Sequence, residues 1–410
     1  MRPWMRMLVG AGVGIVVGAI LPVATGDNLA FMATAAELVI SLGRFAIYPL
    51  LFFGVIIAIH ELRQDKATLR VYGRGALVIV SATGAMVLVA TLVTLFLEPR
   101  RIPPIFQEAA VPALPPLPEY VQEVFPRNMF ALFAGDGTFL LPIVLLAVAL
   151  GLVLYKEGSA ALPAVDVVDS LARTFYRLNW WILEVIAVGL IAVSAAWLMQ
   201  LRSVSDLQLF APLLWVVGSV SALFVLVLFP LAVFFFGDRY SPFAWLYALV
   251  APGITAFFSG DSYFTVGPLT RAAKENFGVS REIAAPVISV STLIAKSGSA
   301  MVIAATFITV LRSYTALEIG LLQVLWVMGS SFLFSFLLGR VPGATVLVGL
   351  SVLSQSYGQG MNDIYLIVLP ALPILTGIAV LVDTMTAALT SFLVGVWERK
   401  RRIVDPYDFV

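Results

Sequence analysis

The chain has 410 residues, of which 60% are hydrophobic and only 12% are charged, and its mean hydropathy is +1.00. A soluble globular domain carries about 25% charged residues, so this chain lacks the charge to cover a water-facing surface and is predicted to lie in a lipid bilayer. Its 25 basic and 24 acidic residues disfavour nucleic-acid binding. The absence of cysteine excludes disulfides and thiol chemistry, and one histidine leaves almost no material for zinc sites or serine–histidine–aspartate triads.

Eight apolar stretches are candidates for full membrane spans, because a transmembrane helix needs about 20 mostly apolar residues. In chain order they are Met5–Val23, Phe45–His60, Ala76–Leu97, Phe139–Tyr155, Trp180–Met199, Leu209–Phe236, Ala284–Val310 and Ile364–Trp397. The first has a basic start but a long apolar part and no convincing cleavage site, which indicates a membrane helix rather than a signal peptide. Two more apolar stretches, Phe243–Pro268 and Leu321–Tyr357, are broken by Gly, Pro and Ser.

The loop charges predict the orientation of the chain. Basic residues cluster before the first span, between the second and third, and after the last. All three clusters fit the cytoplasmic side if the number of full spans is even, which places both termini, including a tail at 399–410, in the cytoplasm. The same count places the proline-rich loop 98–127 outside. A polytopic chain of this kind, without cysteine or cofactor, suits a bacterial inner membrane.

Polar, glycine-bearing backbone interrupts both broken stretches. Ser259, Asp261 and Ser262 lie around a glycine in the first, and Val341-Pro342-Gly343 forms a predicted tight turn in the second. Such backbone at membrane depth is tolerated only when it is buried in protein or lines a wet cavity. Each break alone would equally suit a kinked helix or an ordinary loop. As a pair in one chain they favour two re-entrant helical hairpins, which mark a transporter's binding site.

Five segments share their order and spacing with one known family: Gly43–Phe53, Asn128–Ala134, Phe258–Ser262, Glu275–Val279 and Val341–Ala344. The Glu-Asn-x-Gly-Val and Val-Pro-Gly-Ala segments are the most specific of these. On this basis the chain resembles, over most of its length, the dicarboxylate/amino acid:cation symporters, which have the glutamate-transporter fold.

The resemblance implies an all-α integral membrane protein with eight transmembrane helices plus two re-entrant helical hairpins, acting as an elevator-type transporter. Residues 1–240 would be mainly scaffold and trimerisation helices of a homotrimer, with 75–98 joining the transport core. The transport core at 241–398 would comprise hairpin one (243–270), helix seven (282–312), hairpin two (319–358) and helix eight (364–398). The hairpin tips would gate a small-molecule substrate held near the midplane.

The chain departs from the family where cations and substrate are expected to bind. Counted from Gly278, the family's Asn-Met-Asp-Gly-Thr motif falls on Ala295–Ser299, so its carboxylate is lost and Lys296 replaces the methionine. In the last helix Asp383 matches the family's first Asp. The following Arg, Asn and second Asp positions hold Thr386, Thr390 and Val394.

These departures predict altered chemistry. Both family carboxylates expected to bind sodium are missing, which disfavours sodium coupling at those sites because a hard cation prefers charged oxygen ligands. Thr386 lacks the bidentate fork of arginine, which disfavours acidic amino acids and favours a neutral amino acid or another small polar metabolite. Asp383 would contact a substrate amino group. No cofactor or other metal is expected.

Lys296 would be a charged group inside a membrane helix, which costs at least about 2.5–3.5 kcal/mol at the centre and calls for a partner. One hypothesis is that its ammonium stands in for a bound sodium ion beside Asp383, with Ser297 nearby, and that coupling is to protons or absent. The alternative is a structural lysine–aspartate pair, or a lysine that snorkels to the interface.

The candidate substrate-binding residues lie at the hairpin tips and on the two core helices: Ser259, Asp261, Ser262, Ser299, Val341, Pro342, Gly343, Asp383, Thr386 and Thr390. Asp261 could meet a substrate amine from above, but as a preferred N-cap residue it is favoured as a helix cap. The serines would serve substrate binding or helix packing equally well.

The leading hypothesis for function is secondary active symport of a small polar solute, such as a neutral amino acid or a carboxylate metabolite. One alternative is an uncoupled uniporter or channel on the same fold, which the lost sodium carboxylates favour. Another is a transporter-derived sensor. No catalytic motif points to an enzyme.

Overall fold

The computed structural model describes residues 2–23, 26–97, 99, 101–102, 117–134, 139–204, 206–314, 319–358 and 363–409. Over these residues the chain is helical, and its β structure is limited to one isolated bridge between Val279 and Arg401. Most of the proline-rich loop predicted to lie outside the membrane falls beyond the described residues.

The helices follow one another with short connections. The first part of the chain contains α1 (Pro3–Ile20), α2 (Asp27–Phe45), α3 (Ile47–Gln64), α4 (Thr68–Leu97), α5 (Leu117–Val124), α6 (Ala131–Ala134), α7 (Leu141–Glu157), α8 (Leu162–Arg202), α9 (Ala211–Ala222), the π-helical η3 (Leu223–Leu228) and α10 (Phe229–Phe236). The rest contains α11 (Pro242–Ala248), α12 (Val250–Ser259), α13 (Val266–Arg271), η4 (Ala272–Asn276), α14 (Arg281–Leu293), α15 (Ser297–Tyr314), α16 (Leu321–Phe334), η5 (Leu338–Arg340), α17 (Thr345–Tyr357), η6 (Ile364–Ala371) and α18 (Leu372–Trp397).

In the described part of the chain, seven helical segments are long and apolar enough to cross a membrane, or up to eight if α11 and α12, which bend by 52°, form one span. The shorter apolar helices α16 and α17 belong to the region predicted as hairpin two. An all-helical membrane protein is therefore confirmed, whereas the count of eight full spans stays a prediction. Helix α2 was not among the predicted spans, because Asp27, Glu37 and Arg44 dilute its apolar residues.

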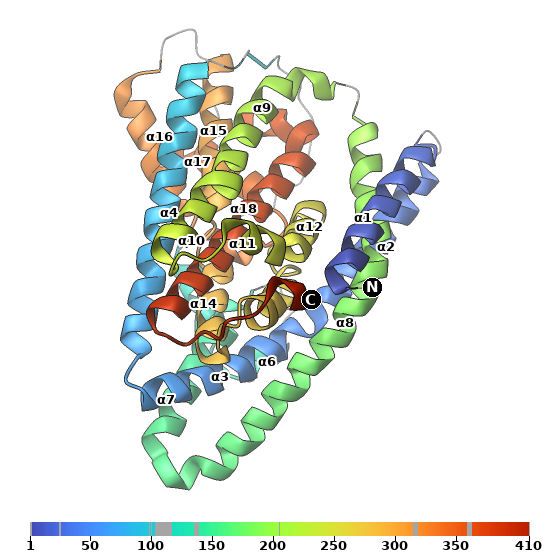
Figure 1. Ribbon diagram of the computed structural model, residues 1–410. Coiled ribbons are helices and arrows are strands. Elements are labelled where there is room, and N and C mark those ends of the chain that lie inside the picture. Colours follow the sequence, from blue (N-terminus) through green and yellow to red (C-terminus); the bar gives the residue numbers. More distant parts are fainter. Residues whose placement is uncertain are drawn as a thin grey trace.

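Helices α1 and α2 pack along the long helix α8, to the right in Figure 1. Glycines let α1 approach closely. A Cβ added at Gly10 would lie 2.1 Å from the carbonyl oxygen of Ala187, and one at Gly14 would lie 2.0 Å from Ser194 Oγ. Small residues at four-residue spacing allow this backbone contact, and van der Waals packing is what joins helices in a membrane.

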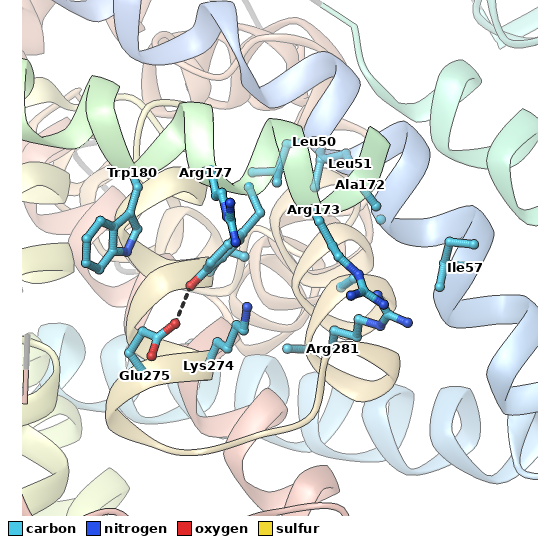
Figure 2. Close-up of a pocket in the computed structure, with 15 residues that line it drawn as sticks. Leu50, Leu51, Ile57, Ala172, Arg173, Arg177, Trp180, Lys274, Glu275 and Arg281 are labelled. Atoms are coloured by element: carbon cyan, nitrogen blue, oxygen red, sulfur yellow. Dashed lines mark hydrogen bonds between the residues drawn. The ribbon is translucent and has the colours of Figure 1, made fainter. Parts of the chain in front are cut away.

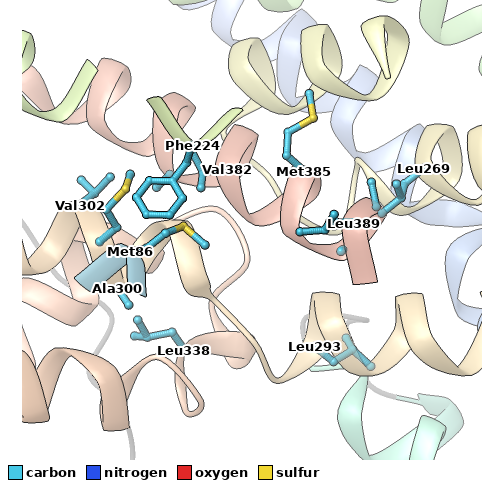
Figure 3. Close-up of a cluster of buried hydrophobic side chains, with 14 of the residues drawn as sticks. Met86, Phe224, Leu269, Leu293, Ala300, Val302, Leu338, Val382, Met385 and Leu389 are labelled. Atoms are coloured by element: carbon cyan, nitrogen blue, oxygen red, sulfur yellow. The ribbon is translucent and has the colours of Figure 1, made fainter. Parts of the chain in front are cut away.

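Helix α15 lies at the centre of the second group, against α4, α16, α17 and α18 (Figure 1). Within an apolar 18-residue stretch of the α14–α15 segment 94% is buried inside the protein, compared with 28% for α1. Figure 3 shows Met86 of α4, Phe224 of η3, Val302 of α15 and Val382 of α18 meeting in this core. Since lipid tails are as apolar as these side chains, close packing rather than water exclusion holds the group together.

Helix seven, predicted as one helix over 282–312, is broken: α14 ends at Leu293 and α15 begins at Ser297. Both helices belong to one span, Arg281–Tyr314, which matches the range expected for helix seven. The break places Lys296 and the free backbone ends of two helices in the interior. The division into scaffold and transport core stays a prediction.

Candidate functional site

The tips of the two broken stretches are in contact. Ser262 donates from its backbone N–H and from its hydroxyl to the carbonyl oxygen of Pro342, at 3.3 and 3.4 Å. Next to it, the Tyr263 hydroxyl donates to the carbonyl oxygen of Gly339 at 2.6 Å. Hydrogen bonds to backbone oxygens satisfy part of the irregular chain that lipid could not solvate.

Two glycines make this junction sterically feasible. Gly260 ends α12 with φ +58°, in the left-handed conformation that glycine adopts at little cost. At Gly339, an added Cβ would lie 1.6 Å from the carbonyl oxygen of Leu293, the last residue of α14. Any larger residue at this position would force hairpin two away from the break between α14 and α15.

Asp383 of α18 binds the start of α15. Its Oδ1 accepts from the N–H groups of Gly298, at 2.7 Å, and Ser299, at 3.3 Å, and its Oδ2 accepts from the Ser299 hydroxyl at 2.8 Å. The N–H groups at a helix start lack helical partners and carry a partial positive charge, so a carboxylate is stabilised there. Ser299 Oγ also lies 3.0 Å from Thr345 Oγ1, at the start of α17 in hairpin two.

Lys296 is fully buried in the break between α14 and α15. Its Nζ donates to Ser262 Oγ at 2.6 Å and to the carbonyl oxygen of Thr292. Among the described residues Lys296 and Asp383 form no direct ion pair, but they lie close enough for each charge to act on the other. The backbone N–H groups at the start of α15 bind the carboxylate of Asp383. The end of α14 leaves the carbonyl oxygen of Thr292 without a helical partner, and this oxygen accepts from Lys296 instead.

Asp261 at the first tip is paired with a residue that sequence reasoning missed. Arg44 of α2 forms an ion pair with its carboxylate, from Nη2 to Oδ2 and from Nε to Oδ1 at 3.3 Å. Asp261 Oδ1 also accepts from the Phe264 N–H at 2.8 Å, in the turn before α13, whose N-cap is Thr265. The sequence could have indicated Arg44, since it is a charged residue in the apolar stretch Ile40–Phe53 and such a residue needs a partner.

Four other predicted site residues form hydrogen bonds within the protein. The hydroxyls of Thr386 and Thr390 donate to carbonyl oxygens one turn earlier in α18, at 2.8 and 2.7 Å. Ser297 faces Thr83 of α4, with 2.6 Å between their hydroxyl oxygens. Ser259 Oγ accepts from the N–H of Asp261 at 3.2 Å and therefore supports the tip itself.

A cavity of about 690 Å³ reaches the joined tips from the side of α2 and α8. Ser259, Gly260 and Gly343 lie in its wall, together with Thr376 of α18. Small-molecule sites commonly have volumes of about 300–1,000 Å³. The cavity is therefore of suitable size for a small molecule and borders the contact between the two tips.

The sodium:dicarboxylate symporter family model matches residues 4–393. Neutral amino acid transporter A from Homo sapiens is 26% identical over 240 residues, which cover 57% of this chain and 43% of that protein. Neutral amino acid transporter B(0), also from Homo sapiens, is 24% identical over 239 residues, covering 57% and 42%. The chain thus spans less than half the length of these relatives. The members of this family are transporters rather than enzymes. Because the family model covers nearly the whole chain, the chain belongs to the sodium:dicarboxylate symporter family.

Proposed function

We propose that this protein is a secondary active transporter for a small neutral amino acid, in which the ammonium of Lys296 occupies the place of a coupling cation. The observation that carries the proposal is the surroundings of Lys296. Its Nζ is bound by a hydroxyl oxygen and a carbonyl oxygen, Ser262 Oγ and Thr292 O, inside a break between two helices. These are the neutral oxygen ligands that would otherwise hold a hard cation.

The polar groups near the tips support a neutral amino acid as substrate. Asp383 offers its carboxylate to an amino group, and the N-terminus of α17, at Thr345, offers N–H groups to an α-carboxylate. Thr386, at the family's arginine position, is nearly fully buried and cannot form the two parallel bonds by which an arginine would bind a second carboxylate. The names of the two relatives, both neutral amino acid transporters, favour the same substrate class.

A tethered ammonium changes the expected coupling. It supplies positive charge at this position in every step of the cycle, so one sodium ion is no longer needed there. Coupling then depends on a proton carried by Lys296 or Asp383, or is absent. The second case, a uniporter, is the alternative to this proposal; the observations behind it are the complete burial of Lys296 and its two hydrogen bonds, which hold the ammonium in place.

An elevator movement fits the way in which the helices pack. Helices α14, α15, α17 and α18 form a tight group around Asp383, whereas α1, α2 and α8 form another. The Arg44–Asp261 ion pair joins the two groups and would have to break when one moves past the other. The homotrimer and the scaffold role of residues 1–240 stay predictions.

Uptake by proteoliposomes tests this function. Purified protein is reconstituted, and uptake of a panel of neutral amino acids is compared with uptake of L-glutamate and L-aspartate, with and without sodium and pH gradients. We expect uptake of neutral amino acids that does not require sodium. Uptake restricted to acidic amino acids, or accumulation only with a sodium gradient, would refute the proposal.

A further inference from the structure

A second cavity, whose lining does not include the two tips, lies between α3 and α8 on one side and α13, η4 and α14 on the other. Its volume is about 410 Å³. Four cationic side chains line it: Arg173, Arg177, Lys274 and Arg281. Figure 2 shows Arg173 and Arg177 of α8 on one side of this space, with Lys274 and Arg281 facing them from the other.

Two of these four cations are neutralised within the protein. Arg281 forms ion pairs with Asp169 and Glu61, and Arg173 pairs with Asp169 at 2.5 Å. The one acidic residue in the lining, Glu275, accepts a hydrogen bond from the Tyr176 hydroxyl at 2.9 Å. The local acids are thus already engaged.

Arg177 and Lys274 make no direct contact with an acidic side chain among the described residues, although Glu275 next to Lys274 attracts its ammonium. Neither takes part in an ion pair or side-chain hydrogen bond of the described residues. Lys274 Nζ instead lies over the ring of Tyr176, 3.8 Å from its centroid. A cation held over an aromatic face beside a second free cation is suited to bind an anion between them.

The rest of the lining is apolar. Leu50, Leu51 and Ile57 of α3 and Ala284 of α14 form a wall that a free inorganic anion would not contact favourably. Trp180 borders the same space and is of the residue type enriched at membrane interfaces. The combination of a cationic end and an apolar wall matches an amphiphile with an anionic head.

We propose that this cavity binds an anionic membrane phospholipid, with its phosphate between Arg177 and Lys274 and the start of an acyl chain against α3. Basic pockets between transmembrane helices bind anionic lipid head groups in this way. The site lies near Glu61 at the end of α3, on the side predicted to be cytoplasmic, where anionic lipids are found. The proposal concerns lipid binding and is independent of the transported substrate.

Native mass spectrometry of the purified full chain tests this site, with phosphatidylglycerol and phosphatidylcholine of identical acyl chains as probes. We expect phosphatidylglycerol to bind more tightly. The double variant R177Q/K274Q should bind it about 30-fold more weakly, because each cation near an anionic lipid contributes about 1 kcal/mol. The control K66Q/K156Q removes two exposed cations elsewhere and should bind it like the unaltered protein.

A second variant separates a lipid from a free phosphate. Gly54 of α3 lines the cavity, and an added Cβ would lie 3.8 Å from Ala285, so the Cβ of Gly54→Leu is accommodated and the rest of its side chain would take up space in the cavity. It should weaken phosphatidylglycerol binding, while calorimetric titration with inorganic phosphate should detect no tight site. Equal binding of both lipids, an unchanged Kd in R177Q/K274Q, or inorganic phosphate binding as tightly as the lipid would each overturn the proposal.

Discussion

Arg44 of α2 and Asp261 at the tip of hairpin one form an ion pair that joins the helix group around α8 to the group around α18. The side chain of Asp261 is 3% exposed and that of Arg44 is 32% exposed. A Cβ at Gly343 would lie 3.2 Å from Asp261 Oδ2, so the tip of hairpin two rests on this pair. One contact therefore connects both tips with α2.

Removal of this arginine should destabilise the protein. In Arg44→Met the buried carboxylate of Asp261 loses its partner, and we expect a loss of about 1–3 kcal/mol, reduced from the value for a fully buried pair because Arg44 is partly solvated. Thermal unfolding in detergent measures the effect. Arg340→Met, which breaks the more exposed pair with Glu123, is the control and should change stability by less than about 1 kcal/mol. A double variant R44M/D261N that is no more stable than R44M would contradict this account.

Gly339→Ala tests the close approach of hairpin two to the end of α14. The added Cβ would overlap the carbonyl oxygen of Leu293, so we expect a loss of stability of about 1–3 kcal/mol and a marked loss of uptake. Gly329→Ala in α16 is the matched control, because nothing lies within 4 Å of its added Cβ. If both variants unfold at the same temperature, Gly339 does not hold the junction.

Asp383→Asn should separate capping from substrate binding. The amide oxygen still accepts from the Gly298 N–H, so we expect a stability loss of only about 1 kcal/mol. The negative charge for a substrate amine is lost, and uptake should fall at least about tenfold, which corresponds to about 1.4 kcal/mol. Ser391→Ala on the same helix is the control, since the Ser391 hydroxyl has no hydrogen-bond partner among the described residues. Normal uptake by D383N would exclude this carboxylate from the binding site.

Thr386→Arg should shift the preference toward acidic substrates. The guanidinium fork would bind a side-chain carboxylate through two parallel hydrogen bonds. The ratio of L-glutamate to neutral amino acid uptake in proteoliposomes should rise. Thr386→Lys adds the same charge without the fork and should shift this ratio less. An equal shift in both variants would attribute the effect to charge alone.

The sequence predicted the interrupted segments because polar, glycine- and proline-bearing backbone inside an apolar stretch cannot face lipid and must be enclosed by protein. Ser259–Ser262 and Val341–Gly343 accordingly lie at two tips that meet. The break at Lys296 was not predicted, because residues 284–310 are apolar enough for one continuous helix, and the interruption depends on Asp383, almost 90 positions away. The Arg44–Asp261 pair was missed for the same reason, since contacts over 217 positions leave no local pattern.

The hydrogen-bond partners of Lys296 were not predicted. Charge alone suggested Asp383, but a carboxylate has two candidate partners here, an ammonium and the start of a helix. Which one it contacts depends on the geometry of the break, and composition carries no information about that geometry. Ser262, by contrast, was identified as a site residue, although its role as a ligand of Lys296 was not predicted.

The sodium dependence of uptake by Lys296→Met, compared with the control Lys156→Met, tests the central claim most directly. Removing the ammonium leaves Ser262 Oγ and Thr292 O without their cation, so we predict that transport by K296M becomes dependent on sodium or falls at least about tenfold, while K156M behaves like the unaltered protein. Uptake by K296M with unchanged rate, sodium response and pH response would contradict the claim that this lysine replaces a bound cation.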